Sequence, residues 1–193
     1  MYPKKFENLI NAYSKLPGVG RKSAERYAFT TLDWDKDTLH ALIQSLEDID
    51  KGIKHCKICG NMSDSDTCSI CSDMNRNKKI ICIVENIRNI EAMEKMEEYN
   101  GVYHVLNGLI NTNKGILPEN LNIDSLLDRI TNDTDEIIIA LDPTIEGETT
   151  TLYLTKLLAG KCKITTLARG IPLGSHIDYA DSLTLLKSFE NRK

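Results

Sequence analysis

The first third of the chain has apolar residues at helical spacing in three segments. In each segment they recur at intervals of three and four positions, which predicts a helix with one apolar face. A five-residue connector joins the first two helices into a hairpin, and the third helix is expected over residues 35–53. Its apolar face should contribute to a core or contact a partner helix in an oligomer. The three faces comprise Phe6, Leu9, Ile10 and Tyr13, then Ala24, Tyr27, Ala28 and Thr31, then Leu39, Leu42, Ile43, Leu46, Ile49 and Ile53.

A different pattern begins at residue 78. Short continuous apolar runs, typical of buried strands, occur in "KKIICIVEN", "VYHVL", "EIIIALD" and "KITTLA". They alternate with helical segments near residues 87–96, 123–131 and 148–159. Strands that alternate with helices predict a mostly parallel sheet covered on both faces. Residues 78–170 are therefore expected to form one α/β domain.

Between these regions lies a cysteine-rich stretch, "CKICGNMSDSDTCSIC". Cys56, Cys59, Cys68 and Cys71 form the pattern C-x2-C-x8-C-x2-C. Two such pairs can place four thiolates around a tetrahedral cation, as structural zinc sites do. So short a stretch buries too little apolar surface to fold alone, whereas zinc binding contributes on the order of 10 kcal/mol in small finger peptides. We expect a structural zinc ion; disulfides and an iron–sulfur cluster are the alternatives.

Charge is unevenly distributed along the 193 residues. The net charge is -4, but the first 31 residues carry +4 and the remaining 162 carry -8. A basic N-terminal segment can therefore contact an anion although the whole chain is acidic. No apolar run approaches the roughly 20 residues that span a bilayer, and "MYPKKFENLI" lacks the apolar centre of a signal peptide. These features predict a cytoplasmic protein.

The connector of the helical hairpin, within "LPGVGRKSAERYAF", combines glycines with basic residues. Gly18 and Gly20 would let backbone N–H groups at the start of the second helix approach a phosphate, where the helix dipole favours negative charge. Arg21, Lys22 and Arg26 would add charge-assisted hydrogen bonds. The alternative is a plain αα-hairpin whose glycines only satisfy turn geometry. The pattern resembles the helix-hairpin-helix element, which contacts the DNA backbone without reading bases.

Acidic residues follow two of the expected strands, at the edge where ligands bind in parallel α/β sheets. Glu85 ends the first strand, Asp142 ends a later one, and Glu146 and Glu148 come shortly after. This arrangement resembles the Toprim domain of topoisomerases and primases, in which a glutamate and an Asp-x-Asp pair bind magnesium. Thr144 replaces the second acid of that pair, which leaves fewer oxygen ligands than Mg²⁺ prefers. Helix capping is the alternative role of these acids.

No other catalytic pattern is present in the sequence. It contains no P-loop, no G-x-S-x-G elbow and no HExxH motif. His104 lies within the apolar run "VYHVL" and is expected to be a buried histidine with satisfied hydrogen bonds rather than a base. We therefore assign no catalytic residue from the sequence.

The order of these segments, followed by "GIPLGSHIDYADSLTLLKS", resembles the RecR family of bacterial recombination mediators over essentially the whole chain. The resemblance implies an α+β multidomain fold. It would comprise a helix-hairpin-helix domain at residues 1–53, a four-cysteine zinc finger at 54–77 and a Toprim domain at 78–170. A C-terminal helical tail at 171–193 would contact the Toprim domain and other subunits.

The resemblance also implies a function. RecR proteins are similar in forming homodimers to homotetrameric rings that clamp DNA, and in acting with RecO and RecF to load recombinase on gapped or single-stranded DNA near the nucleoid. Lys22 and Arg26 would contact DNA, and Glu85 and Glu146, with Asp142 beside them, would contact RecO. The alternatives are a magnesium-dependent, Toprim-type nuclease or primase-like enzyme and a zinc-knuckle adaptor that never binds DNA.

Overall fold

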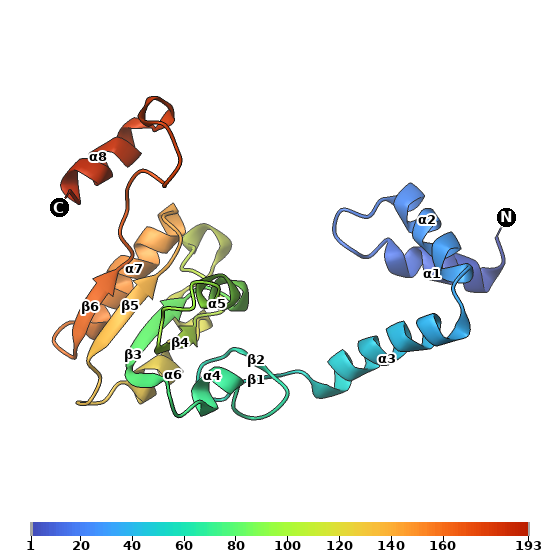
Figure 1. Ribbon diagram of the computed structural model, residues 1–193, viewed down its shortest axis with the longest axis horizontal. Coiled ribbons are helices and arrows are strands. Elements are labelled where there is room, and N and C mark those ends of the chain that lie inside the picture. The colour runs from blue at the N-terminus through green and yellow to red at the C-terminus, as the bar shows by residue number, and fades with distance from the viewer. Residues whose placement is uncertain (1, 193) are drawn as a thin grey trace. The chain divides into compact units, whose positions relative to one another are not determined.

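The computed structural model describes residues 2–192, which divide into two compact units at Ile53 and Lys54. The first unit is helical, and the second contains the cysteine-rich segment, a central sheet and the C-terminal helix (Figure 1). Among the described residues, no helix has both the length and the apolar character needed to cross a membrane.

The N-terminal unit contains three helices, and the first two share a small core. Ile10 of the first helix packs against Ala24 and Ala28 of the second, and all three side chains are fully buried. The predicted helical hairpin is therefore present, but its connector covers residues 14–20 and is longer than the five residues expected. The helices are α1 (Lys4–Tyr13), α2 (Arg21–Leu32) and α3 (Lys36–Gly52).

Helix α3 presents its apolar face to the surface. Asp35 caps its N-terminus by accepting a hydrogen bond from the Thr38 N–H at 2.8 Å. None of its described residues is buried, and Leu46 and Ile49 are 59% and 61% exposed. Within the N-terminal unit, α1 and α2 leave most of this face exposed, so the expected contribution to a core is not seen there. Contact with a partner helix in an oligomer stays a prediction.

The second unit begins with very short elements around the cysteines. Strand β1 (Lys54–His55) pairs in antiparallel fashion with β2 (Met62–Ser63), and helix α4 (Ser69–Ser72) follows. Elements this short bury little apolar surface, so the cysteine cluster is the centre of this segment.

A four-stranded parallel sheet forms the centre of the second unit. The strand order is β4-β3-β5-β6, and every neighbouring pair is parallel, which confirms the predicted mostly parallel sheet. The strands are β3 (Asn77–Val84), β4 (Gly101–Val105), β5 (Glu136–Ala140) and β6 (Lys163–Thr166). The α-helices of this part are α5 (Ile87–Glu94), α6 (Asp124–Arg129), α7 (Ile145–Leu158) and α8 (Ser182–Glu190), with 3-10 turns at Thr112–Lys114, Pro118–Asn120 and Ile177–Tyr179.

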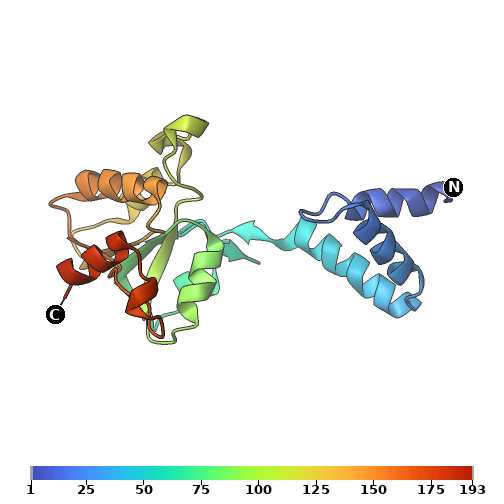
Figure 2. The same cartoon turned by 90° about the horizontal axis from the view of Figure 1, so that it is seen from above.

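Both faces of the sheet are covered, as the sequence predicts. Along β3, Ile81 and Ile83 belong to the apolar cluster that includes α6 and α7. The alternate residues, Cys82 and Val84, belong to the cluster that includes Ile90 of α5. Figure 2 shows α5 and α7 on opposite sides of the sheet. This alternation explains why β3 reads as a continuous apolar run in the sequence.

Candidate functional site

The four cysteines of the C-x2-C pairs converge in the second unit. All four side chains are buried, and their sulfur atoms lie within 4.8 Å of one another. Each pair spans one tight turn, since the Gly60 N–H donates to the Cys56 carbonyl at 2.9 Å and the Ser72 N–H donates to the Cys68 carbonyl at 3.0 Å. The cluster consists of Cys56, Cys59, Cys68 and Cys71.

Two thiols of this cluster, those of Cys59 and Cys68, are difficult to ionise. The Cys71 side chain, together with burial, raises the pKa of Cys59, and burial raises the pKa of Cys68. Burial also disfavours the Cys56 thiolate, but backbone N–H groups of Cys68, Cys59 and Ile58 bring the pKa of Cys56 down to about 7. A divalent cation stabilises thiolates, so four clustered cysteines fit a structural zinc ion with no open coordination position.

The hairpin between α1 and α2 leaves the start of α2 open to an anion. Gly20 is the N-cap residue, with φ -76° and ψ 168°, and no side chain among the described residues caps the first turn. Gly18 has φ +78°, a conformation that favours glycine, and a Cβ on either glycine would meet no atom within 4 Å. The first N–H groups of α2 are therefore free to bind an acceptor from outside the chain.

The basic residues at this hairpin are not equivalent. Arg21 forms ion pairs with Glu7 and Glu25, which raise its pKa and compensate its charge. Lys22 and Arg26 are exposed, and among residues 2–192 neither forms an ion pair. The Arg26 guanidinium lies 5.6 Å from the centre of the Tyr27 ring. Of the three predicted contacts, Lys22 and Arg26 therefore offer uncompensated charge.

The predicted acids lie along the carboxyl edge of the sheet. Val84 and Ala140 are paired in register on β3 and β5, so Glu85 and Asp142, which follow them, lie at the same edge. Glu146 lies in the first turn of α7 and accepts a hydrogen bond from Asn111 Nδ2 at 3.0 Å. Within residues 2–192, however, these carboxylates do not form a cluster of three potential metal ligands. They share an edge without converging on one point.

Thr144, the residue that replaces an acid, has a structural role. Its hydroxyl accepts a hydrogen bond from the Gly147 N–H at 3.1 Å and caps α7. A Cβ on Gly147 would lie only 1.9 Å from the Asp142 carbonyl oxygen, so this close turn requires glycine. Helix α7 therefore begins before the predicted start at residue 148. The N-cap residues are therefore Thr144 for α7 and Asn86 for α5 rather than the acids, although Glu146 lies in the first turn of α7, where the helix dipole favours negative charge.

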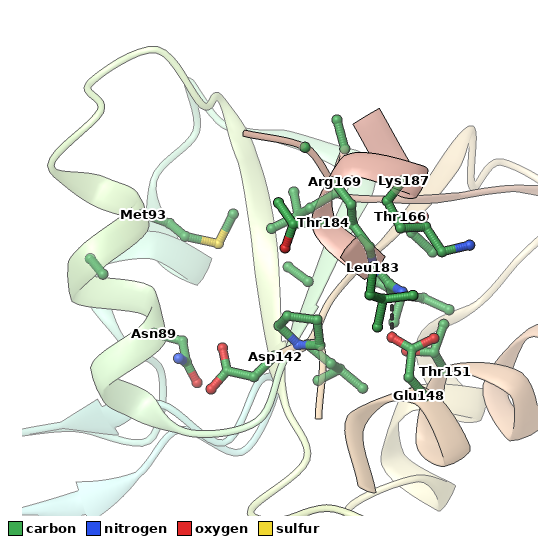
Figure 3. A pocket seen from close by; sticks show the side chains of 18 of the residues that line it. Asn89, Met93, Asp142, Glu148, Thr151, Thr166, Arg169, Leu183, Thr184 and Lys187 are labelled. Atoms are coloured by element: carbon green, nitrogen blue, oxygen red, sulfur yellow. Dashed lines mark ion pairs between the residues drawn. The ribbon is translucent and has the colours of Figure 1, made fainter. Parts of the chain in front are cut away.

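A cavity of about 820 Å³ lies between this edge and α8 (Figure 3). Asp142 points toward it from the edge, and Asn89 and Met93 line it from α5. Across it, Arg169 forms an ion pair with Glu148 of α7. The sequence did not predict this ion pair, because it depends on how the tail returns to the sheet.

His104, in strand β4, lies in the interior of the second unit and makes two hydrogen bonds there. Its side chain is fully buried, and Arg129 Nη1 lies 3.1 Å from its Nδ1. Because a guanidinium can only donate, Nδ1 accepts, and Nε2 then donates to the Asn122 carbonyl at 2.6 Å. Burial lowers the pKa of His104 to about 4. The prediction of a buried histidine with satisfied hydrogen bonds is confirmed.

Comparison with known protein families gives four matches along the chain. Residues 6–49 match the family described as RecR, helix-hairpin-helix, and residues 53–73 match the four-cysteine zinc finger domain of RecR. Residues 79–168 match the Toprim domain, and residues 170–193 match the RecR C-terminal family. These matches confirm the predicted modules and their order.

Two curated relatives match over nearly their whole length. Both are named Recombination protein RecR, from Staphylococcus aureus strains MRSA252 and Newman. Each is 42% identical over 193 residues, which cover 99% of this chain and 98% of the relative.

Proposed function

Because the chain belongs to the RecR family of recombination proteins, we propose that it acts in recombinational repair as a non-enzymatic DNA clamp. The observation that carries this proposal is the hairpin before α2, where an uncapped helix N-terminus lies beside two cations that form no ion pair within residues 2–192. Backbone N–H groups at Gly20 and beyond would bind a phosphate, and Lys22 and Arg26 would bind neighbouring phosphates. Such contacts hold the DNA backbone and are independent of base sequence.

Several linked hairpins would bind DNA more tightly than one. A site with a few phosphate contacts binds weakly, but joining copies raises the effective concentration of the second site and multiplies affinity without new contacts. We therefore propose that the chain acts as a homodimer or homotetrameric ring. Its acidic remainder, with net charge -8 over the last 162 residues, does not repel DNA from the basic hairpin if the hairpins face the bound strand.

The carboxyl edge of the sheet is the proposed contact with RecO, with RecF as a further partner. Asp142 is exposed and Glu85 is half-buried at this edge, and Glu146 lies in the first turn of the helix that follows it. Negative charge along one edge of a domain can steer association with a basic partner. Support for this assignment comes from the family resemblance and from the shared position of the three acids.

The Toprim domain is proposed to bind rather than catalyse. Thr144 stands where a second acid is expected, and it caps α7 with its hydroxyl. A magnesium-dependent nuclease or primase-like activity would require a site that gathers hard oxygen ligands. Incubation of labelled gapped DNA with the protein and Mg²⁺ tests this alternative. Cleavage that is abolished by Glu85→Ala would overturn the non-enzymatic proposal.

The DNA-binding proposal is tested by removing the charges of Lys22 and Arg26. We expect Lys22→Ala/Arg26→Ala to weaken binding to gapped DNA at least tenfold, and to make the log-log salt dependence shallower by about 0.9 for each phosphate that is no longer neutralised. The matched control is Lys36→Ala/Lys51→Ala, which removes the same charge from the two ends of α3. Fluorescence anisotropy from about 50 to about 300 mM salt measures both double variants. Equal binding by the two would contradict the proposed interface.

A further inference from the structure

Arg129, the last residue of α6, is a half-buried cation without a carboxylate partner among the described residues. Its Nη1 donates to the Tyr103 carbonyl at 2.7 Å and to His104 Nδ1 at 3.1 Å. Both acceptors are uncharged, and within residues 2–192 Arg129 forms no ion pair with a carboxylate. Burying a guanidinium is unfavourable unless an anion offsets its charge.

Arg76 shows how the same unit stabilises another shielded arginine. Its guanidinium, 17% exposed, forms an ion pair with Glu94 and donates to the Tyr99 carbonyl at 3.0 Å. Glu94 in turn accepts a hydrogen bond from the Tyr103 hydroxyl at 2.7 Å. Arg76 thus has a carboxylate to offset its charge, whereas Arg129 needs another anion.

The cysteine cluster packs against the end of β4, the strand whose Tyr103 and His104 accept hydrogen bonds from Arg129. The Val105 N–H, one residue beyond His104, donates to the Cys59 carbonyl at 2.8 Å. Gly60 fits against Val105 and the Asn122 side chain, where a Cβ would approach Asn122 Nδ2 to 3.2 Å. Asn122 Nδ2 also donates to the Val105 carbonyl at 3.0 Å. The turn of the first C-x2-C pair and the residues that anchor Arg129 thus form one packed region.

The charge balance agrees with this placement. Burial lowers the pKa of Arg129, and the four cysteines are the groups that act in the opposite direction and favour its charged form. A zinc ion bound by four thiolates carries a net double negative charge, so the centre presents an anion to its surroundings. Groups around a metal site that balance its charge or orient its ligands commonly change metal affinity by roughly 10- to 100-fold.

We propose that Arg129 is the counter-charge of the zinc centre, held in position by the Tyr103 carbonyl and His104, and that it links the zinc finger electrostatically to the Toprim domain. The link is reciprocal. Bound zinc stabilises the half-buried guanidinium, and the guanidinium slows the loss of zinc. Arg129 is a positioning residue in this scheme and does not itself bind the metal.

The test measures zinc retention by the full-length, zinc-loaded protein. Transfer of zinc to a chromogenic chelator is compared for wild type, Arg129→Gln and Arg129→Lys. We expect a loss of zinc affinity of roughly 10- to 100-fold for Arg129→Gln and a smaller loss for Arg129→Lys, which keeps the charge but not the planar hydrogen-bonding group. The matched control is Arg76→Gln, which removes the other shielded arginine and should retain zinc within about twofold of wild type.

A spectroscopic readout separates charge from general destabilisation. In the Co²⁺-loaded protein, a cation beside the sulfur atoms holds their electrons more tightly, so its loss should move the sulfur-to-cobalt charge-transfer band to longer wavelength in Arg129→Gln but not in Arg129→Lys. If Arg129→Gln does not fold, Arg129→Met, which retains an unbranched apolar stem, replaces it. Wild-type zinc affinity in the neutral variants, equal losses for Arg129→Gln and Arg129→Lys, or an equal loss for Arg76→Gln would each overturn the proposal.

Discussion

His104 illustrates how one residue can be read correctly from its position in the sequence. A histidine in the middle of an apolar strand is expected to be buried and neutral, and the structure places it between two hydrogen-bond partners. Its partner Arg129 could not have been identified in this way. The pairing requires the end of α6 to lie beside β4, and no local pattern records that contact. The same holds for Arg169 and Glu148.

The burial of neutral His104 predicts an acid-sensitive fold. Its pKa is lowered from an ordinary value near 6.5 to about 4, so at intermediate pH the unfolded chain binds a proton that the folded chain does not. The contribution to stability is therefore complete above about pH 6.5 and is lost as the pH falls toward about 4. We expect His104→Gln to be less stable than wild type at about pH 7 and to lose less stability on acidification.

Urea unfolding followed by circular dichroism between about pH 7.5 and about pH 4.5 measures this difference, with zinc content determined at each pH. The gap between wild type and variant should narrow by up to about 3 kcal/mol across the interval. The exposed His176 provides the control, and His176→Gln should follow the wild-type dependence. A constant gap between wild type and His104→Gln would refute the assignment.

At the level of elements, the sequence predicted type and order better than boundaries. Helix α7 begins at Ile145 because Thr144 caps it and Gly147 permits a close turn over the Asp142 carbonyl, whereas the apolar pattern alone suggested residue 148. A threonine three residues before a glycine is only a weak signal for a helix start, because it marks one here only in combination with the strand that ends just before it. The two strands that place Glu85 and Asp142 at the same edge were expected from their apolar runs, but β3 ends at Val84 and β5 ends at Ala140, one and two residues before those acids.

The zinc finger is the element whose stability depends most directly on its ligand. Its strands contain two residues each and its helix contains four, so the metal and the contacts of Gly60 with Val105 must hold it together. We expect zinc removal by a chelator to abolish amide protection over residues 54–73 while leaving residues 4–32 protected, because the core of α1 and α2 lies in a separate compact unit.

Hydrogen exchange measured by mass spectrometry before and after chelation tests this expectation. Re-addition of zinc should restore protection, which separates metal loss from irreversible damage. Cys56→Ser should reproduce the chelated pattern, whereas Cys162→Ser, outside the cluster, should not. Full protection of residues 54–73 in protein shown to lack zinc would mean that the finger is stabilised by packing alone.

At the level of the whole molecule, the order of modules was evident from the sequence, because each carries its own local signature. Those local signatures cannot predict how several copies of the chain would assemble. The apolar face of α3 fits either a core or a partner helix by its spacing, and only the structure shows that α1 and α2 leave most of this face exposed. Exposed apolar helix faces of this kind are commonly covered by another subunit.

The proposed clamp therefore makes a prediction about α3. Leu46→Glu/Ile49→Glu places two charges on the exposed apolar face, so it should reduce the oligomer to a smaller species in sedimentation velocity without unfolding the chain. Because avidity depends on linked hairpins, affinity for gapped DNA should fall at least tenfold although Lys22 and Arg26 are intact. The control, Ala41→Glu/Gln44→Glu, adds the same charge to the opposite face of α3. If both variants keep the wild-type mass and affinity, this face does not join subunits. The hairpin must then bind DNA without the gain in affinity that linked copies would provide.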